Sequence, residues 1–194
     1  PLILVINPGS TSTRVALYKG RELIKDQHLD HSADTLGNTL DQIPMRTACV
    51  TGFLGALEKT VSDCDAIAAR GGPFRPVPGG VYTVNEPMLA DARCPEFPDH
   101  ISRIACIIAH TLADQAGIPA YIVDPVSTDE YAPLSRISGL KDCPRQSLLH
   151  ALNLRAAARR YANEIGKPYE ECNLITAMLG GGISIAVHAK GRMI

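Results

Sequence analysis

A short pattern of apolar strand, small-residue turn and second apolar strand occurs near both ends of the chain. At the start it reads VINPGSTSTRVALY, residues 5–18, and near the end it reads LITAMLGGGISIAVHA, residues 174–189. Between these stretches, helical and strand patterns alternate. Two such units separated by alternating helices and strands predict an α/β fold built from two related domains. We place the first domain at residues 1–125 and the start of the second, incomplete domain at residues 126–194.

Three strands are predicted in the first 30 residues, LILVIN, RVALYK and ELIKDQHL, followed by a helical pattern. The strands are joined by the PGSTST turn and a tight turn at Gly20, which predicts an antiparallel meander. From His31 to Glu58 apolar residues recur at helical spacing, with a break expected at Pro44.

The middle of the chain predicts short strands and two helices. CDAIAAR, VYTVN and PAYIVD read as strands, and GGPFRPVPGG reads as a loop. A helix is expected over Asp99–Ala116, ended by Gly117, and a longer one begins near Arg145 and ends at Gly166.

The second unit reaches only its hairpin before the sequence stops at Met193-Ile194. A strand pair at this point has an unpaired edge and no covering helices. We therefore expect the chain to be part of a longer polypeptide.

Composition and charge favour a small-molecule partner. The 194 residues are 45% hydrophobic and carry 19 basic and 20 acidic side chains with no block of one sign, so nothing points to nucleic acid or a membrane surface. No apolar stretch approaches the roughly 20 residues that a bilayer requires, and the start has no signal-peptide pattern. The six cysteines are scattered without C-x-x-C pairs, which predicts free thiols and a cytosolic location rather than zinc or disulfides.

The two small-residue turns are candidate phosphate sites. The turn of residues 8–12 offers backbone N–H groups and hydroxyls without bulky side chains, and the Gly180, Gly181 and Gly182 turn with Ser184 has the same character. Either turn alone is typical of an ordinary hairpin, but their recurrence favours phosphate. No P-loop and no G-x-G-x-x-G string before a helix is present.

Five stretches in order along the chain resemble the butyrate kinases of the acetate kinase family. They are VINPGSTSTRVALY, AARGGPFRPVPGGVYTVNEPML, YIVDPVSTDEY, RQSLLHALNLRAAAR and LGGGISIAVHAKGRMI. The resemblance is to the N-terminal half of these longer proteins, which belong to the superfamily of actin, sugar kinases and heat-shock ATPases. It implies an actin-like ATPase (RNase H-like) domain with a mixed sheet flanked by helices, and the beginning of a second similar domain.

The resemblance also implies an activity. These enzymes transfer phosphoryl reversibly between ATP and the carboxylate of a short-chain fatty acid, giving an acyl phosphate and ADP with Mg²⁺, and dimers are common among them. We therefore expect ATP and Mg²⁺ as cofactors, butyrate or a close analogue as substrate, and a homo-oligomer. The 194 residues alone are expected to be inactive, because the adenosine pocket and further cleft residues of the family lie beyond Ile194.

In the first domain the resemblance assigns a nucleotide-phosphate site and a substrate site. Asn7 matches a residue near the metal and the phosphates, and Gly9, Ser10 and Ser12 match donors to phosphate, as do the glycines of the second turn. A turn stabilised by its own Asn and Ser side chains is the alternative. Arg14 could reach an anion or simply be solvated.

Two further residues of this domain concern the substrate. Arg70 matches a residue that holds the acyl substrate or the phosphoryl group, since a guanidinium can grip either with two parallel hydrogen bonds. A structural pair with Asp65 or Glu86 is the alternative. His100 matches a histidine near the substrate.

In the second part of the chain the resemblance assigns Asp124 and His150. Asp124 ends an apolar strand and matches a magnesium-supporting carboxylate, and an Asp that starts a turn before Pro125 is the alternative. His150, expected inside the last long helix, matches a donor to the transferring phosphoryl, and an ordinary packed histidine is the alternative.

Two positions depart from the family pattern. Met178 stands where the family usually has a histidine before its glycine turn, and a thioether cannot donate to phosphate. Leu149 replaces a common aromatic residue. Acetate or propionate kinase is a nearby alternative, although the GGVYTVNEP and DPVSTDEY stretches resemble the butyrate kinases more closely. Met178 and the end of the sequence inside the second unit leave open a non-catalytic nucleotide-binding or assembly module.

Overall fold

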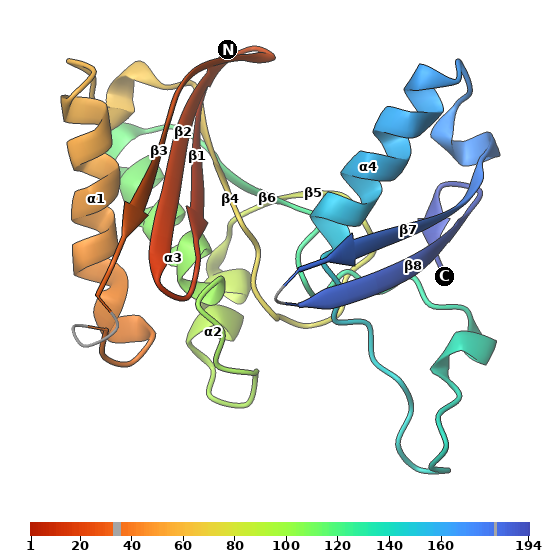
Figure 1. The fold of residues 1–194 in the computed structure, drawn as a ribbon. Helices are drawn as coiled ribbons and strands as arrows, with labels where there is room; N and C mark the ends of the chain where they lie inside the picture. Colours follow the sequence, from red (N-terminus) through yellow and green to blue (C-terminus); the bar gives the residue numbers. More distant parts are fainter. Residues whose placement is uncertain (33–35, 181) are drawn as a thin grey trace. The chain divides into compact units, whose positions relative to one another are not determined.

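The computed structural model describes residues 1–32, 36–180 and 182–194. The chain forms two compact units (Figure 1). Unit 1 consists of Pro1–Phe74 and Val81–Val123, and unit 2 consists of Arg75–Gly80 and Asp124–Ile194.

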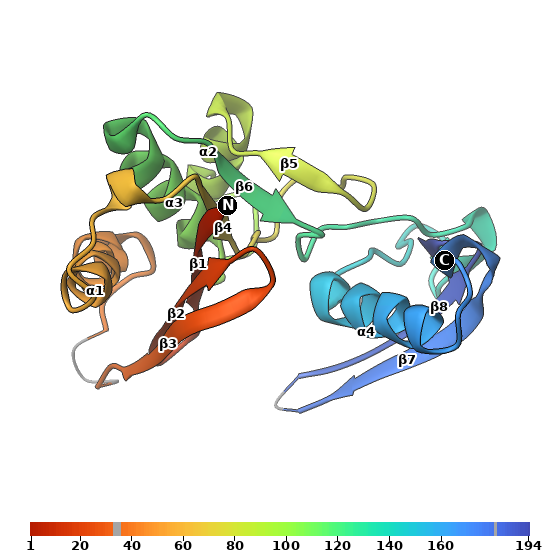
Figure 2. The same ribbon diagram turned by 90° about the horizontal axis from the view of Figure 1, so that it is seen from above.

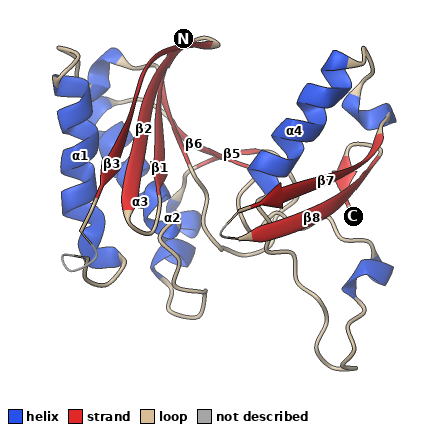
Figure 3. Cartoon of the chain, in the orientation of Figure 1, coloured by secondary structure: helices blue, strands red, loops and turns tan. Residues whose placement is uncertain are grey.

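Unit 1 contains a mixed six-stranded sheet in the order β3-β2-β1-β4-β6-β5 (Figure 1; strands are red in Figure 3). Its strands are β1 (Leu2–Pro8), β2 (Ser12–Lys19), β3 (Glu22–Asp30), β4 (Ala66–Ala69), β5 (Val81–Thr83) and β6 (Ala120–Val123). The first three strands pair antiparallel, which confirms the predicted meander. Strands β1, β4 and β6 run parallel, and β5 pairs antiparallel with β6.

Helices α1 (Ile43–Gly55) and α3 (Arg103–Ala116) cover one face of this sheet (Figure 2). On that face Leu4, Ile6, Val15 and Leu17 are fully buried in a core that both helices share. Burial of such a continuous apolar face is the main stabilising contribution to a unit of this kind.

The helix boundaries of unit 1 correct two predictions. Pro44 is the second residue of α1 rather than a break, because a proline in the first turn of a helix loses no hydrogen bond. Helix α3 begins at Arg103 rather than Asp99, while its end before Gly117, whose φ is +69°, is as expected. Helix α2 (Glu86–Arg93) was not predicted, although its Asn85 cap is a recognisable start signal.

Unit 2 is built from a three-stranded antiparallel sheet and one long helix. The strands are β7 (Asn173–Leu179), β8 (Ile183–Ala189) and β9 (Arg192–Met193), and the helix is α4 (Ala151–Glu164). Leu154 and Ala158 of α4 are buried in two small clusters against this sheet. The opposite face of β7 and β8 is apolar but exposed, with Ile175 and Leu179 each 74% accessible.

In the part of the chain that the structure describes, no helix combines the length and the apolar character that crossing a bilayer requires.

Candidate functional site

The first small-residue turn joins β1 to β2 and leaves backbone donors available. The Gly9 N–H donates to the Ser12 carbonyl at 2.8 Å, which closes the turn. Ser10 and Thr11 are exposed, and no acceptor among the described residues pairs with either backbone N–H. A side chain on Gly9 would place its Cβ 3.1 Å from Ser12 Oγ, a close contact. The turn therefore offers neighbouring N–H groups of the kind that bind phosphate oxygens.

Arg46 of α1 holds this turn from its buried side. Its side chain is completely buried. Nη1 donates to the Ser12 carbonyl at 2.5 Å and to Thr13 Oγ1 at 2.9 Å, and Nη2 donates to the Ser10 carbonyl at 3.3 Å. Sequence reasoning missed this residue, although Arg46 shares the helical spacing of the buried Val50 and Phe53.

Arg70 lies beside Asn7 at one edge of the sheet. In the parallel pair of β1 and β4, Ile6 is opposite Ala69, and the Arg70 N–H donates to the Ile6 carbonyl at 3.1 Å. Asn7 and Arg70 therefore follow at the carboxyl ends of neighbouring strands, where α/β sheets commonly bind ligands.

The Arg70 guanidinium has no protein counter-ion among the described residues. It is half-buried, and this burial lowers its pKa. The alternative pair with Asp65 or Glu86 is not formed, because Asp65 instead accepts the Leu2 N–H at 2.6 Å. Arg14, by contrast, pairs with Asp26 on the surface at 2.6 Å. Arg70 is thus the cation of this edge that is free to meet an anionic ligand.

His100 lies just before α3, near the segment that follows Arg70. A Cβ on Gly72 would lie 2.7 Å from the Arg103 Cα, so this segment packs directly on the start of α3. The His100 side chain is exposed, and its Nδ1 lies 2.7 Å from Ser102 Oγ. This bond within the chain orients the ring.

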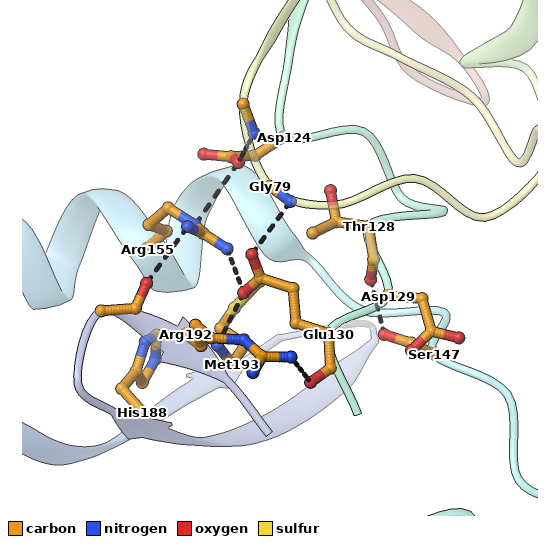
Figure 4. A network of polar contacts seen from close by, with 12 residues as sticks. Gly79, Asp124, Thr128, Asp129, Glu130, Ser147, Arg155, His188, Arg192 and Met193 are labelled. Carbon is orange, nitrogen blue, oxygen red and sulfur yellow. Dashed lines mark hydrogen bonds and ion pairs between the residues drawn. The ribbon is translucent and has the colours of Figure 1, made fainter. Parts of the chain in front are cut away.

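Asp124 directly follows β6 and is the first residue of the Asp124–Ile194 segment of unit 2. Its carboxylate contacts other groups of the protein. It is 5% exposed and has a φ of +40°. Its Oδ1 accepts the Gly80 N–H at 2.9 Å and lies 3.4 Å from Arg155 Nε (Figure 4). No donor among the described residues pairs with Oδ2.

The contacts of the Asp124 carboxylate decide how it could take part in a Mg²⁺ site. A carboxylate oxygen without a protein partner is a hard ligand of the kind that Mg²⁺ takes, often alongside water and phosphate. The described residues hold no group of three or more His, Cys, Asp or Glu side chains that could bind a metal ion. Asp124 therefore fits Mg²⁺ only as one ligand or through water, with the remaining ligands supplied by phosphate and solvent.

Arg155 of α4 links Asp124 to Glu130 (Figure 4). Its Nη2 donates to Glu130 Oε2 at 2.6 Å, and Glu130 also accepts the N–H groups of Gly79 at 3.0 Å and Met193 at 2.8 Å. Burial alone would raise the pKa of Glu130, but these N–H donors and the Arg155 charge outweigh it and lower the pKa. A Cβ on Gly79 would displace the Arg155 guanidinium from its present position.

His150 is the N-cap residue of α4, so the prediction that it lies inside the helix is wrong. Residues 145–150, which were expected to be helical, have no regular secondary structure, and helix α4 begins at Ala151. The His150 Nδ1 lies 2.8 Å from Ser184 Oγ, and a Cβ on Gly182 would lie 3.0 Å from the ring carbon Cε1. The ring thus lies against the second small-residue turn.

The second turn is closed by a hydrogen bond between two of its glycines. The Gly180 N–H donates to the Gly182 carbonyl at 3.2 Å. Gly181 lies outside the residues that the structure describes. A Cβ on Gly180 would lie 3.6 Å from the Met178 methyl, so the thioether lines the turn.

The predicted site residues fall into two sets, one in each unit. Unit 1 holds Asn7, Gly9, Ser10, Ser12, Arg70 and His100. Unit 2 holds Asp124, His150, Gly180 and Gly182.

The sequence is similar to curated butyrate kinases along almost its entire length. It is 44% identical over 195 residues to the probable butyrate kinase of Enterococcus faecalis, covering 99% of this chain and 54% of that protein. It is also 44% identical over 195 residues to butyrate kinase 1 of Clostridium acetobutylicum, of which it covers 55%. The chain therefore spans about half the length of the curated relatives it matches. No protein-family model matches it.

Solved structures bear out the fold. The acetate kinase of Porphyromonas gingivalis aligns with all of this chain and 56% of its own, with a TM-score of 0.72 at 16% identity. The acetate kinase of Entamoeba histolytica gives a TM-score of 0.67 at 13% identity, and 54% of that chain is covered. At these identities the likeness concerns the fold alone. The chain is thus a homologue of the butyrate kinases that matches their N-terminal half and has the corresponding half of the acetate kinase fold.

Proposed function

We propose that this chain supplies one part of a carboxylate kinase that transfers phosphoryl between ATP and butyrate or a close short-chain analogue. The observation that carries the proposal is the edge of unit 1, where the free N–H groups of Ser10 and Thr11 and the unpaired Arg70 follow neighbouring strands. N–H groups suit phosphate oxygens, and a guanidinium without a counter-ion suits a carboxylate or a transferring phosphoryl group.

In the proposed reaction a carboxylate oxygen of butyrate attacks the γ-phosphorus of ATP. A new oxygen–phosphorus bond forms, the bond to the bridging oxygen of ADP breaks, and ADP leaves with that electron pair. Such a transfer requires positioning and charge neutralisation but no covalent enzyme intermediate. Arg70 would hold the carboxylate or phosphoryl, and His150 would donate to the phosphoryl oxygens.

Mg²⁺ would neutralise phosphate charge in this reaction. Asp124 is the proposed supporting carboxylate, and Asn7 is the proposed contact on the side of the first turn. His100 is proposed to lie near the acyl substrate, and Gly9, Ser10, Ser12 and the second turn, Gly180 to Gly182, to bind the nucleotide phosphates. Two related actin-like domains, residues 1–125 and the start of a second at 126–194, remain part of this proposal.

The proposed setting is a homo-oligomer in the cytosol. All six cysteines are free, which supports a reducing compartment. The mixed signs of the surface charge favour a small-molecule substrate and neither nucleic acid nor a membrane.

A nucleotide-binding module without turnover is the second candidate, and Met178 is the observation that favours it. Its thioether lines the second turn at the position where the family that the sequence resembles usually has a histidine donor. Acetate or propionate as the preferred substrate is a variant of the first candidate.

The test is ATP-dependent formation of butanoyl hydroxamate from butyrate and hydroxylamine, measured on the full-length protein. The kinase proposal predicts a signal that requires ATP, Mg²⁺ and butyrate together. Nucleotide binding without any acyl hydroxamate from butyrate, propionate or acetate would favour the module.

A further inference from the structure

Arg46 is a fully buried cation whose hydrogen bonds to the described residues all go to neutral groups. Its Nε and Nη2 donate to Gln42 Oε1 at 3.1 and 2.8 Å, and the remaining bonds go to Thr13 Oγ1 and to the carbonyls of Ser10 and Ser12. No carboxylate pairs with it anywhere in the described part of the chain. Burying a charge is costly, and buried arginines usually have a carboxylate partner. The missing countercharge therefore requires an explanation.

His31, the histidine next to Arg46, adds no second positive charge to this buried site. His31 Nε2 lies 2.8 Å from Thr13 Oγ1, next to the guanidinium. Burial, and then the Arg46 charge, lower the pKa of His31 and keep the ring neutral near pH 7. The guanidinium itself remains protonated, because an arginine pKa is far above that range.

The direction of the Arg46 Nη2 bond explains why the Thr11 N–H of the turn is free. Nη2 binds the Ser10 carbonyl, and the N–H of that same peptide unit belongs to Thr11. In a trans peptide the C=O and N–H point in opposite directions, so a carbonyl drawn toward Arg46 directs the Thr11 N–H away from it. The Thr11 carbonyl in turn accepts the His31 N–H at 2.8 Å. The turn is held through its carbonyls, and its exposed side keeps the donors.

We infer that Arg46 is a positioning residue and the fixed positive charge behind an anion site in the first turn. A phosphate-class oxyanion bound by the Ser10 and Thr11 N–H groups supplies a negative charge that no carboxylate among the described residues gives to Arg46. The inference rests on the proposed function for the identity of that anion. Arg46 does not touch the ligand in this arrangement, because it lies on the carbonyl side of the turn.

The test uses Gln42→Glu, which keeps the shape and the acceptor atom but places a carboxylate against the guanidinium. The matched control is Gln27→Glu, the same chemical change on the exposed face of β3. Inorganic phosphate is titrated into the 194-residue chain, and the Ser10 and Thr11 amide signals are followed by ¹H–¹⁵N correlation spectra. In Gln42→Glu the Gln42 Nε2 hydrogen bond to the Gly37 carbonyl, 3.0 Å long, is lost, and thermal unfolding of each variant reports the resulting change in stability.

We expect phosphate to shift both amides of the parent chain, and Gln42→Glu to weaken its affinity by about five- to tenfold, since a neutralised charge attracts the anion less. Gln27→Glu should change the affinity less than twofold. Arg46→Lys keeps a positive charge but loses the planar fork whose two nitrogens reach the Ser10 and Ser12 carbonyls, so it should also weaken binding. It tests the positioning role if Gln42→Glu does not fold.

The outcomes separate this inference from the proposal on which it rests. Unchanged affinity in the folded Gln42→Glu or Arg46→Lys chain overturns the role of Arg46 and leaves the phosphate turn standing. An absence of amide shifts in the parent chain overturns both the phosphate turn and the role of Arg46. Phosphate binding that Gln42→Glu weakens, in a protein that forms no acyl phosphate, supports the Arg46 inference and removes only the kinase.

Discussion

The Nδ1 atom of His150 lies 2.8 Å from Oγ of Ser184, and the backbone N–H of His150 points at the same oxygen at 3.4 Å. Ser184 is buried in β8, next to the second turn. An oxygen that accepts the backbone N–H has its own hydrogen to donate to Nδ1. This arrangement favours the tautomer with its proton on Nε2, which is the form that can donate to a phosphoryl oxygen from the far side of the ring.

Ser184→Ala should therefore release the ring without unfolding the chain. We expect the two neutral tautomers of His150 to become mixed and the catalytic constant of the full-length protein to fall by about tenfold or more. Long-range ¹H–¹⁵N spectra of the ring report the tautomer, and His150→Gln identifies the signals. Ser62→Ala, an exposed position, is the control. An unchanged ring spectrum and an unchanged catalytic constant would show that Ser184 only caps α4.

Gly9→Val should weaken phosphate binding at the first turn while the sheet remains folded. The added side chain enters a space where Ser12 Oγ is already 3.1 Å from the Cβ position, and it obstructs close approach to the backbone. Gly139→Val, at a site with nothing within 4 Å, is the matched control. Phosphate affinity equal in both variants would favour the simple hairpin.

The stability of the chain should fall in mild acid because of His188. This side chain is fully buried, with Nδ1 2.6 Å from the Tyr169 hydroxyl and Nε2 2.7 Å from Thr176 Oγ1. Burial, and then the Arg155 charge, lower its pKa. Below the unfolded value of about 6.5 the unfolded chain binds a proton that the folded chain refuses, so the free energy of unfolding decreases as the pH falls.

Urea unfolding at pH 7.5 and 5.5 measures this effect. One such histidine contributes at most about 1.4 kcal/mol per pH unit. His188→Gln, which can keep one hydrogen bond, should reduce the difference between the two pH values, and the part that remains is assigned to His31, whose pKa is also lowered. An equal pH dependence with and without His188 would exclude it as the source.

Asp124→Asn should raise the Mg²⁺ concentration needed for half-maximal activity of the full-length protein. The amide keeps an acceptor for the Gly80 N–H but loses the charge that a metal or its water requires. Glu130→Gln is the matched control, because it also removes a carboxylate from Arg155. Both variants should lose stability. A magnesium requirement that Asp124→Asn leaves unaltered would assign Asp124 to the Arg155 network alone.

The strands of unit 1 could be predicted because their patterns are local. Leu4 and Ile6 alternate with less buried residues, and short turns join β1, β2 and β3 in order, so the meander follows from the sequence. The start of α4 could not be predicted in this way. The stretch before Ala151 has good helix formers, but Ser147 is buried with its hydroxyl on the Thr128 carbonyl, and such a distant contact overrides local propensity.

The sequence marks candidate site residues where a motif stands out, and it does not reveal contacts between residues far apart in the chain. The glycine and serine turn stood out, and so did Arg70 before its two glycines. Nothing in the sequence pairs Arg46 with a turn more than 30 residues earlier, since Ser12 and Arg46 are separated by 34 positions. The partner of Asp124 was likewise hidden, because Arg155 lies in an Ala- and Arg-rich helix that looks solvated.

Arg70→Lys is the sharpest test of the proposed substrate site at the edge of the sheet. Arg70 has no ion pair and no side-chain hydrogen bond among the described residues, so replacing it breaks no such polar contact. Lysine keeps the charge but cannot make two parallel hydrogen bonds to a carboxylate or a phosphoryl group. We expect the catalytic constant of the full-length protein to fall on the order of 10- to 1000-fold, with nearly unchanged thermal stability. Arg21→Lys, in the exposed β2–β3 turn, should leave the kinetics as they are. Kinetics of Arg70→Lys within a factor of two of the parent would mean that the fork of Arg70 meets neither substrate nor phosphoryl, and that the edge beside Asn7 serves some other ligand.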